Sequence, residues 1–174
     1  TNLNEEEREQ KELLYILNDI LKSDPGPFYF IDIHTTSSKT LPFITINDAI
    51  INRNFSKLFP VPIVLGIEEY LNGPLLSYIN ELGYVSLGFE SGQHEDEKAI
   101  INSISFIYLT LVYSKTIALE KVIDFPVHYN RLKTESQGLL DIFEVVYLHK
   151  IKMDESFSME DGFKSFQDIN AHTV

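Results

Sequence analysis

The sequence contains no cysteine, and its Lys and Arg residues form no cluster. Without cysteine the chain can form neither a disulfide framework nor a thiolate zinc site. The 14 basic residues are scattered and are outnumbered by 26 acidic ones, which gives a net charge of −12 at pH 7. Proteins that bind nucleic acid present clustered Lys and Arg to its phosphates. We therefore expect no nucleic-acid partner.

The chain also lacks an apolar run long enough to cross a membrane, which takes roughly 20 residues. Its longest apolar stretch, 100–113, is broken by Asn102, Ser103 and Ser105. No signal peptide, phosphate-binding glycine loop or Gly-x-Ser-x-Gly elbow is present. We therefore expect no membrane partner and a cytoplasmic location. At 174 residues, 44% of them hydrophobic, the chain can still bury a core.

The apolar pattern up to residue 118 alternates between that of strands and that of helices. Strands are predicted where short β-branched or aromatic runs lie between turn residues, and helices where apolar residues recur every three or four positions. The predicted helices are 5–22, about 50–58, 75–82 and 99–113, and the predicted strands are 28–33, 42–46, 63–67 and 84–89. This alternation predicts an α/β fold with a mainly parallel sheet covered by helices.

The pattern changes from Leu119 onward. Residues 128–131 and 142–152 alternate apolar and polar side chains, as half-exposed antiparallel strands do. Gly138 and Gly162 mark turns. We therefore expect two units: an α/β core over residues 1–118, and a small, incomplete β-rich C-terminal subdomain over residues 119–174.

The first strand, 28–33, is mostly aromatic and β-branched, which is typical of a strand buried on both faces. It is followed by His34, and ligands in open α/β sheets bind beyond the carboxyl ends of strands. Asp32 and His34 share one face of the strand because side chains alternate with a period of two. His34 is therefore placed to hold a metal, although a histidine that closes a core strand gives the same pattern.

A second chemically able side chain, Glu90, follows the fourth strand and lies between Gly88 and Gly92. Glycines let the backbone pass close to a ligand. A carboxylate beside a metal-bound water can serve as general base and then as general acid, as a zinc hydrolase requires. The alternative is a strand-end carboxylate that accepts backbone N–H bonds. Position alone does not decide between the two.

His94 and Glu97 have the spacing of two metal ligands on one turn of a helix. The chain has 26 acidic residues, so this spacing arises easily by chance. Asp96 and Glu97 are also explained as first-turn residues of the helix 99–113, where negative charge is favourable. We therefore expect these residues to start a helix rather than to bind a metal.

Two motifs resemble those of a known enzyme family. The segment 31–37, Ile-Asp-Ile-His-Thr-Thr-Ser, resembles the Asp-Leu-His strand end of the succinylglutamate desuccinylase and aspartoacylase family. The segment 88–93, Gly-Phe-Glu-Ser-Gly-Gln, resembles that family's Gly-x-Glu-x-Gly signature, and the two motifs come in the same order. The resemblance implies a zinc-dependent amidohydrolase with a carboxypeptidase-like α/β fold and a β-rich C-terminal subdomain.

The resemblance also implies roles for individual residues. His34 would be a zinc ligand, Glu90 the carboxylate that activates a zinc-bound water, and Asp32 a neighbour that orients the histidine. The substrate would be an N-acyl amino acid or a related amide. Its contacts would come from the hydroxyl-bearing residues that follow His34, namely Thr35, Thr36 and Ser37.

Other parts of the family's pattern are missing from this chain. The family places a His-x-x-Glu pair of zinc ligands upstream, and residues 1–28 contain no histidine. Residues 77–89 contain no arginine, where aspartoacylase carries one for its substrate carboxylate. We therefore expect an internal fragment of a longer hydrolase or a shortened homologue, which by itself binds zinc weakly and catalyses little. The alternatives are a carboxypeptidase-like peptidase and a non-catalytic binding module that keeps the fold.

Overall fold

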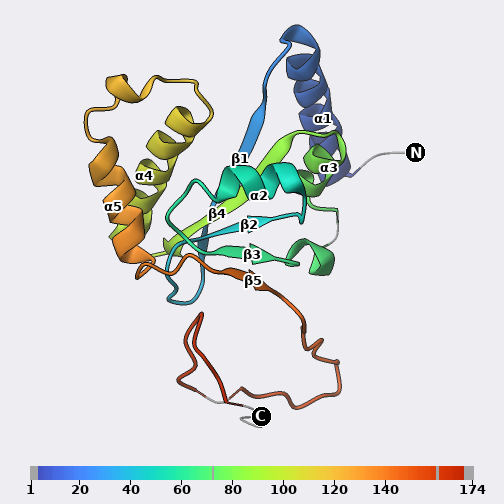
Figure 1. The fold of residues 1–174 in the computed structure, drawn as a ribbon. Coiled ribbons are helices and arrows are strands. Elements are labelled where there is room, and N and C mark those ends of the chain that lie inside the picture. Colours follow the sequence, from blue (N-terminus) through green and yellow to red (C-terminus); the bar gives the residue numbers. More distant parts are fainter. Residues whose placement is uncertain (1–3, 72, 160, 171–174) are drawn as a thin grey trace.

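The computed structural model describes residues 4–71, 73–159 and 161–170, and it contains a sheet of five strands. The strands are β1 (Tyr29–Thr36), β2 (Phe43–Ile46), β3 (Ile63–Leu65), β4 (Val85–Gln93) and β5 (Ile142–Glu144). Their order across the sheet is β1-β4-β2-β3-β5 (Figure 1). β2 and β4 run antiparallel, whereas the other three neighbouring pairs run parallel. The predicted α/β fold with a mainly parallel sheet is confirmed.

The described residues also form five α-helices. They are α1 (Glu5–Ser23), α2 (Ile50–Ser56), α3 (Leu75–Glu81), α4 (Glu97–Tyr113) and α5 (Phe125–Glu135), with short 3-10 turns at Glu68–Tyr70 and Leu119–Lys121. The four helices that were predicted from periodicity are all present.

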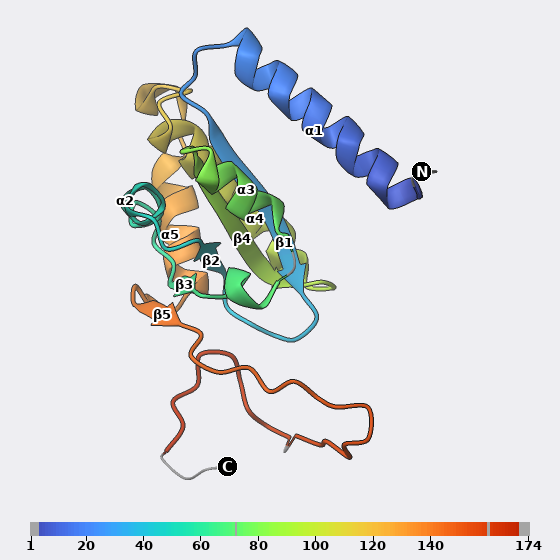
Figure 2. The same cartoon turned by 90° about the vertical axis from the view of Figure 1, so that its right-hand side faces the viewer.

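Two adjacent residues of β4 show which helices cover which face of the sheet, because neighbouring side chains of a strand point to opposite faces. Position 88 faces Leu76 of α3, with 3.7 Å between an ideal Cβ at Gly88 and the Leu76 Cδ1. Phe89 instead stacks on Phe106 of α4, with ring centroids 3.9 Å apart. α3 therefore covers one face, and α4 with α5 packed against it covers the other (Figure 2).

The core lies between the sheet and α4. Phe89, Phe106 and Leu87 are fully buried, and Phe59 also stacks on Phe106 with ring centroids 4.5 Å apart. Aromatic pairs of this kind contribute about 1 kcal/mol each beyond the burial of their area. This packing fixes β4, the strand that carries the second sequence motif, in the interior of the sheet.

The first helix, α1, packs differently from the others. It begins with a capping box, in which the Asn4 side chain accepts a bond from the Glu7 N–H at 2.7 Å and the Glu7 side chain accepts one from the Asn4 N–H at 2.9 Å. None of its residues is buried, and Figure 2 shows it standing apart from the sheet. Leu13 and Ile20, whose spacing predicted the helix, are 54% and 47% exposed. Periodicity thus predicted this helix but not the surroundings of its apolar side.

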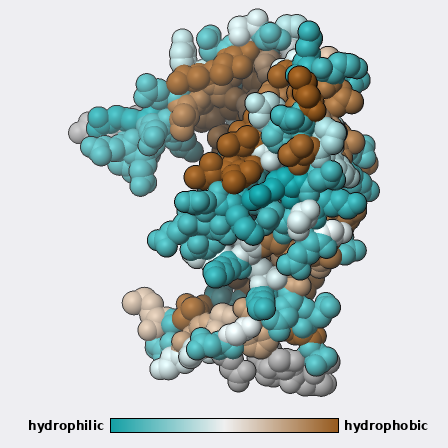
Figure 3. Space-filling model, turned by 90° about the vertical axis from the view of Figure 1, so that its left-hand side faces the viewer, coloured by the Kyte–Doolittle hydropathy of each residue, from teal (hydrophilic) through white to brown (hydrophobic). Residues whose placement is uncertain are grey.

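Apolar side chains are also exposed elsewhere on the molecule. Figure 3 shows apolar patches separated by polar surface on one face. On α4, the residues Ile100, Ile104 and Ile107 recur at helical spacing and are all exposed. α4 therefore carries apolar side chains on its exposed side as well as on its buried side. Within the part of the chain that the structure describes, no helix is long and apolar enough to cross a bilayer.

β1 does not lie where the sequence predicted. It occupies an edge of the described sheet, and residues 32–34 are exposed, so the strand is not buried on both faces. Its aromatic side chains pack locally instead. Phe30 contacts Tyr84 and Tyr29 contacts Phe55, with ring centroids 6.0 Å and 4.7 Å apart. An aromatic run can therefore belong to a central strand or to an edge strand whose aromatic end is covered. The sequence pattern does not distinguish the two.

The segment after residue 118 differs most from the prediction. Residues 128–131, which were predicted as a strand, lie in α5, where Pro126 occupies the favoured first turn. Of the predicted strand 142–152 only Ile142–Glu144 forms β5, and it pairs parallel to β3. The described residues beyond 144 form no further helix or strand. The predicted β-rich character is therefore wrong for these residues, whereas the division of the chain after residue 118 stays a prediction.

Gly88 has no room for a side chain. A Cβ at this position would overlap the hydroxyl of Thr45 on the neighbouring strand β2. Glycine is thus required by the close approach of Thr45 rather than by its own backbone angles. A Cβ at Gly88 would lie on the side of the sheet that α3 covers.

We predict that Gly88→Ala destabilises the fold by about 1–3 kcal/mol, the usual cost of overpacking a tight site. The measurement is urea denaturation of the variant and the wild type. Thr45→Ala removes the hydroxyl that the new methyl group would meet. Gly88→Ala should therefore lower the free energy of unfolding clearly less in the Thr45→Ala protein than in the wild type. An equal loss of stability in both backgrounds would show that Thr45 is not the obstacle.

Candidate active site at the β1–β4 edge

The two sequence motifs lie side by side in the sheet. β1 and β4 are neighbouring parallel strands, and His34 is the register partner of Glu90. Both strands continue beyond their predicted ends, β1 to Thr36 and β4 to Gln93, so both residues lie within strands rather than after them. The register becomes irregular just beyond His34. Residues far apart in the sequence are thereby brought to one edge of the sheet.

Asp32 and His34 point to the same face of β1, as their spacing predicted. Asp32 Oδ1 lies 3.1 Å from His34 Nε2, and the two side chains are 49% and 60% exposed. This contact orients the imidazole through one ring nitrogen. His34 is therefore an exposed histidine at the sheet edge and not one that closes a buried core strand.

Glu90 is half-buried, and one of its two carboxylate oxygens has no hydrogen-bond partner among the described residues. This oxygen, Oε2, is also inaccessible to solvent. Burial raises the pKa of the Glu90 carboxyl group, and the nearby charge of Asp32 raises it further, while His34 and His94 act in the opposite direction. Oε2 accepts no backbone N–H bond. The structure therefore does not show the alternative arrangement, in which a strand-end carboxylate is fully satisfied by backbone N–H groups. A carboxyl group in this setting can both accept and return a proton.

The hydroxyl-bearing residues after His34 are tied to the end of β4. Thr35 Oγ1 lies 2.7 Å from His94 Nδ1, and the Thr36 hydroxyl lies 3.3 Å from the Gly92 carbonyl oxygen of β4 as well as 2.8 Å from that of Ser38. The Ser37 carbonyl oxygen accepts a longer bond, 3.4 Å, from the side-chain amide of Gln93. The predicted role of Thr35, Thr36 and Ser37 in binding substrate stays a prediction.

Two residues of this region were not predicted to support it. Ser91 is fully buried, and its hydroxyl donates to the His34 carbonyl oxygen at 2.9 Å. His94 donates its backbone N–H to the Thr36 carbonyl oxygen at 3.0 Å, and its ring faces Thr35. Both follow Glu90 on β4 or just beyond it. The sequence does place Ser91 and His94 at the end of the fourth strand. That position indicates a role beside His34 only once β1 and β4 are known to be neighbours.

The residues that follow His94 start helix α4 in the structure. Asp96 caps α4 by accepting a bond from the Lys98 N–H at 2.9 Å, and Glu97 is the first residue of the helix. Within residues 4–71, 73–159 and 161–170 there is no group of three His, Asp or Glu side chains that could hold a metal ion. The prediction that these residues start a helix is confirmed.

A cavity of about 620 Å³ opens beside these groups. Asp32, His34 and Glu90 from the sheet line its polar side, and Leu75 and Leu76 of α3 are among the residues that line its apolar side. Small-molecule sites usually measure roughly 300–1,000 Å³. The cavity is thus large enough for a small ligand whose one end would meet Glu90.

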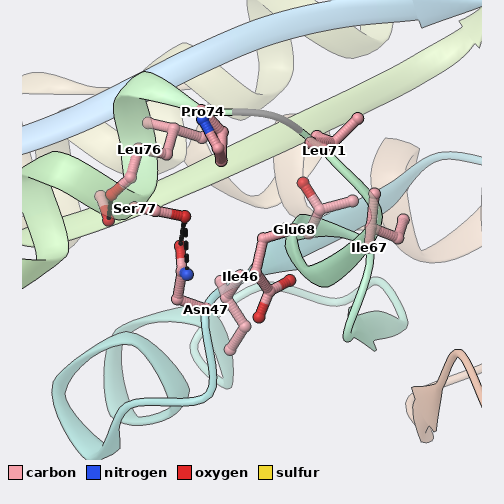
Figure 4. Close-up of a pocket in the computed structure, with 10 residues that line it drawn as sticks. Ile46, Asn47, Ile67, Glu68, Leu71, Pro74, Leu76 and Ser77 are labelled. Carbon is pink, nitrogen blue, oxygen red and sulfur yellow. Dashed lines mark hydrogen bonds between the residues drawn. The ribbon is translucent and has the colours of Figure 1, made fainter.

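A smaller pocket of about 60 Å³ under α3 shares Thr45, Leu71 and Leu76 with this cavity (Figure 4). At its rim, the side chains of Asn47 and Ser77 are joined by hydrogen bonds of 2.8 Å and 3.2 Å. Asn47 precedes α2 but does not cap it, because this helix starts without a side-chain cap. Asn47 instead ties α3 to the end of β2, which fixes the apolar wall of the cavity.

The chain was compared with known proteins. No protein-family model matches it, and no curated protein matches it. The crystal structure of a succinylglutamate desuccinylase/aspartoacylase from Rhodobacter sphaeroides matches 50% of this chain and 27% of its own, at 19% identity and a TM-score of 0.40. The apo structure of the ectoine utilization protein EutE (DoeB) from Ruegeria pomeroyi matches 49% of this chain and 30% of its own, at 18% identity and a TM-score of 0.41.

About half of this chain is similar in structure to each of these two proteins. The first of them is of the kind that the two sequence motifs resemble. The likeness concerns the fold alone at this level of identity. The chain spans less than a third of the length of either protein. These matches therefore do not show that the chain has the activity of either whole protein.

We predict that Glu90→Gln raises the free energy of unfolding at neutral pH by on the order of 1 kcal/mol, the scale expected for a buried group without a hydrogen-bond partner. Because burial raises the pKa of Glu90 in the folded state, folding favours its protonated form. The wild type therefore loses stability as the pH rises from about 4, the usual range of a glutamate, through the raised pKa of the folded state. Gln has the same shape without the charge and avoids this loss.

Urea denaturation of both proteins at about pH 4 and about pH 7 measures the effect. The advantage of Glu90→Gln should be present at the higher pH and should shrink at the lower one. Glu12→Gln, on the exposed helix α1, is the matched control and should leave stability almost unchanged. A Glu90→Gln protein that is less stable than wild type at neutral pH would contradict the prediction.

Proposed function

We propose that this chain is the whole or a part of an amide hydrolase that acts on N-acyl amino acids or related amides, as succinylglutamate desuccinylases and aspartoacylases do. The observation that carries the proposal is the register pairing of His34 with Glu90 on neighbouring parallel strands. The two residues come from the two motifs that resemble that family, and both line the same cavity. The order of the motifs in the sequence supports the same proposal.

Glu90 would transfer the proton in this reaction. Its carboxylate would accept a proton from the water whose oxygen forms a bond to the amide carbonyl carbon. The same carboxyl group would then return the proton to the nitrogen as the C–N bond breaks, which releases an acid and an amine. A carboxyl group with a raised pKa suits both steps, because it holds the proton more readily than an exposed glutamate and can still release it.

Asp32 and the hydroxyl residues would have supporting roles. Asp32 would orient the His34 imidazole through the 3.1 Å contact to Nε2. Such a contact is typical of histidines whose other ring nitrogen binds a metal. Thr35, Thr36 and Ser37 would contact the substrate from the loop beyond His34.

Zinc is the cofactor that the resemblance implies, and the described residues do not make a complete site for it. Zinc in a catalytic site is held by three protein ligands. His34 is one suitable donor, but in the described ranges no group of three His, Asp or Glu side chains is arranged so that it could hold a metal ion. A zinc ion at His34 would therefore need ligands from outside the described residues.

We predict that the chain by itself binds zinc only weakly, and that His34→Ala removes this binding. Titration with zinc, followed by NMR of the histidine rings, is the measurement. His128 lies on α5, where its Nδ1 is 3.2 Å from the Ser105 hydroxyl oxygen, so His128→Ala is a control away from the site. Tight zinc binding that survives in His34→Ala would contradict the assigned ligand.

Hydrolysis is tested with the chain in excess zinc and a panel of N-acetyl amino acids, by release of the free amine. We predict slow hydrolysis that falls by about 10²-fold or more in Glu90→Gln, the usual effect of losing a general base. Faster hydrolysis of peptides with a free C-terminus would favour a peptidase. Saturable binding of N-acetyl amino acids with no hydrolysis would favour a binding module and overturn the hydrolase proposal.

A further inference from the structure

The ladder between β1 and β4 is irregular just beyond Glu90. The register pairs His34 with Glu90 and then Thr36 with Gln93, so β4 advances three residues where β1 advances two. An extra residue of this kind, a β-bulge, is common next to active sites, where it re-aims a side chain. It also interrupts the ladder hydrogen bonds, and the buried backbone groups that it frees need other partners.

Two buried side chains supply such partners. The Ser91 hydroxyl donates to the His34 carbonyl oxygen at 2.9 Å, and the Ser91 carbonyl oxygen accepts a bond of 2.9 Å from Nδ2 of Asn102 on α4. Ser91 is fully buried, and Asn102 is 2% exposed. Hydrogen bonds in the interior are strengthened by the low dielectric, and a connected set of them rigidifies its surroundings. These bonds therefore hold the end of β4 and the His34 backbone in one arrangement.

Arg131 of α5 fixes the orientation of the Asn102 amide. Its Nε donates to Asn102 Oδ1 at 3.1 Å. A guanidinium group can only donate, so it selects the amide oxygen and leaves Nδ2 for the Ser91 carbonyl oxygen. Nη2 of Arg131 lies 3.7 Å from Glu135 Oε1, one turn further along the same helix. A continuous chain of polar contacts thus runs from α5 through α4, which packs beside it (Figure 1), to the backbone of His34.

Asn52 of α2 offers a comparison at the other end of β4. It is fully buried, and its Oδ1 accepts a bond of 3.0 Å from the Ser86 N–H. Its Nδ2 donates to the Asn47 carbonyl oxygen at 3.2 Å. Asn52 and Asn102 are thus buried asparagines that each tie β4 to a helix. The bonds of Asn52 lead on to the end of β2, whereas those of Asn102 lead on to β1.

We propose that Asn102 and Arg131 are positioning residues for the candidate site. They hold the bulge at Ser91 and through it set the position of His34 relative to Glu90, although neither of them is among the residues that line the cavity. The helices on one face of the sheet thereby fix the geometry of a site on the other face. This positioning follows from the contacts alone, whereas its consequence for amide hydrolysis rests on the proposed function.

NMR of the backbone amides, without zinc or substrate, compares Asn102→Ala with Asn52→Ala. Both changes remove a buried amide that bonds to β4, so both should lower the urea concentration at the midpoint of unfolding. The Thr35 N–H belongs to the same peptide group as the His34 carbonyl oxygen, so its signal reports on the bond from Ser91. Asn102→Ala should shift this signal, and Asn52→Ala should not. Equal shifts in both variants, or none in Asn102→Ala, would overturn the proposal.

Two further variants separate the contacts of Asn102. Asn102→Asp keeps an acceptor for Arg131 but loses the donor to the Ser91 carbonyl oxygen. It should therefore shift the Thr35 signal as Asn102→Ala does. Arg131→Met lets the Asn102 amide turn over and should shift the same signal by a smaller amount, whereas Lys133→Met on the exposed side of α5 should not. These variants keep the proposal testable if Asn102→Ala does not fold, and a Thr35 signal at its wild-type position in both Asn102→Asp and Arg131→Met would overturn it.

Amide hydrolysis gives a second readout. A misplaced general base slows the chemical step more than it weakens substrate binding, so kcat of Asn102→Ala should lie about tenfold or more below that of Asn52→Ala, with a smaller change in KM. The expected Thr35 shifts in a protein that hydrolyses no amide would overturn the proposed function and leave this inference standing. Hydrolysis with equal kcat in both variants would support the function and overturn this inference.

Discussion

Parallel hydrogen bonding between β1 and β4 is the interaction on which the candidate site depends. It sets His34 opposite Glu90 and Asp32 opposite Gly88. β4 is itself held by the stacking of Phe89 on Phe106, so the interior packing fixes one strand and the ladder then fixes the other. β1 lies at the edge, and a slip of one residue would turn Asp32 and His34 to the opposite face of the sheet. The geometry of the site thus follows from the register of a single strand pair.

The same face of the sheet combines features that do not favour stability. Glu90 keeps a buried carboxylate oxygen without a partner, and Gly88 has no side chain because Thr45 lies too close. α3 covers this face of the sheet without filling the space above it, since a cavity of about 620 Å³ remains. Local departures from good packing and full hydrogen bonding are expected at functional sites. Their coincidence at one place is what distinguishes this face from the well-packed face under α4.

Much of the fold could be predicted from the sequence up to residue 118, because its helices and strands carry clear apolar periods. The spacing of Asp32 and His34 also predicted correctly that they share a face. The strand predicted at 128–131 was wrong, since Tyr129 and Leu132 pack towards the core at helical spacing that a short alternating pattern obscured. The edge position of β1 was missed as well. An aromatic run does not reveal how many neighbours a strand has.

The sequence by itself determined the types of the main elements and the two short motifs, because backbone propensity and side-chain period act over a few residues. Only the tertiary structure decided that β1 lies beside β4, and hence that His34 meets Glu90 and that Ser91 and His94 join the same region. It also decided which side chains line the cavity, since that depends on how α3 packs over β1 and β4. Pairings between distant segments depend on packing across the whole sheet, which no local pattern contains.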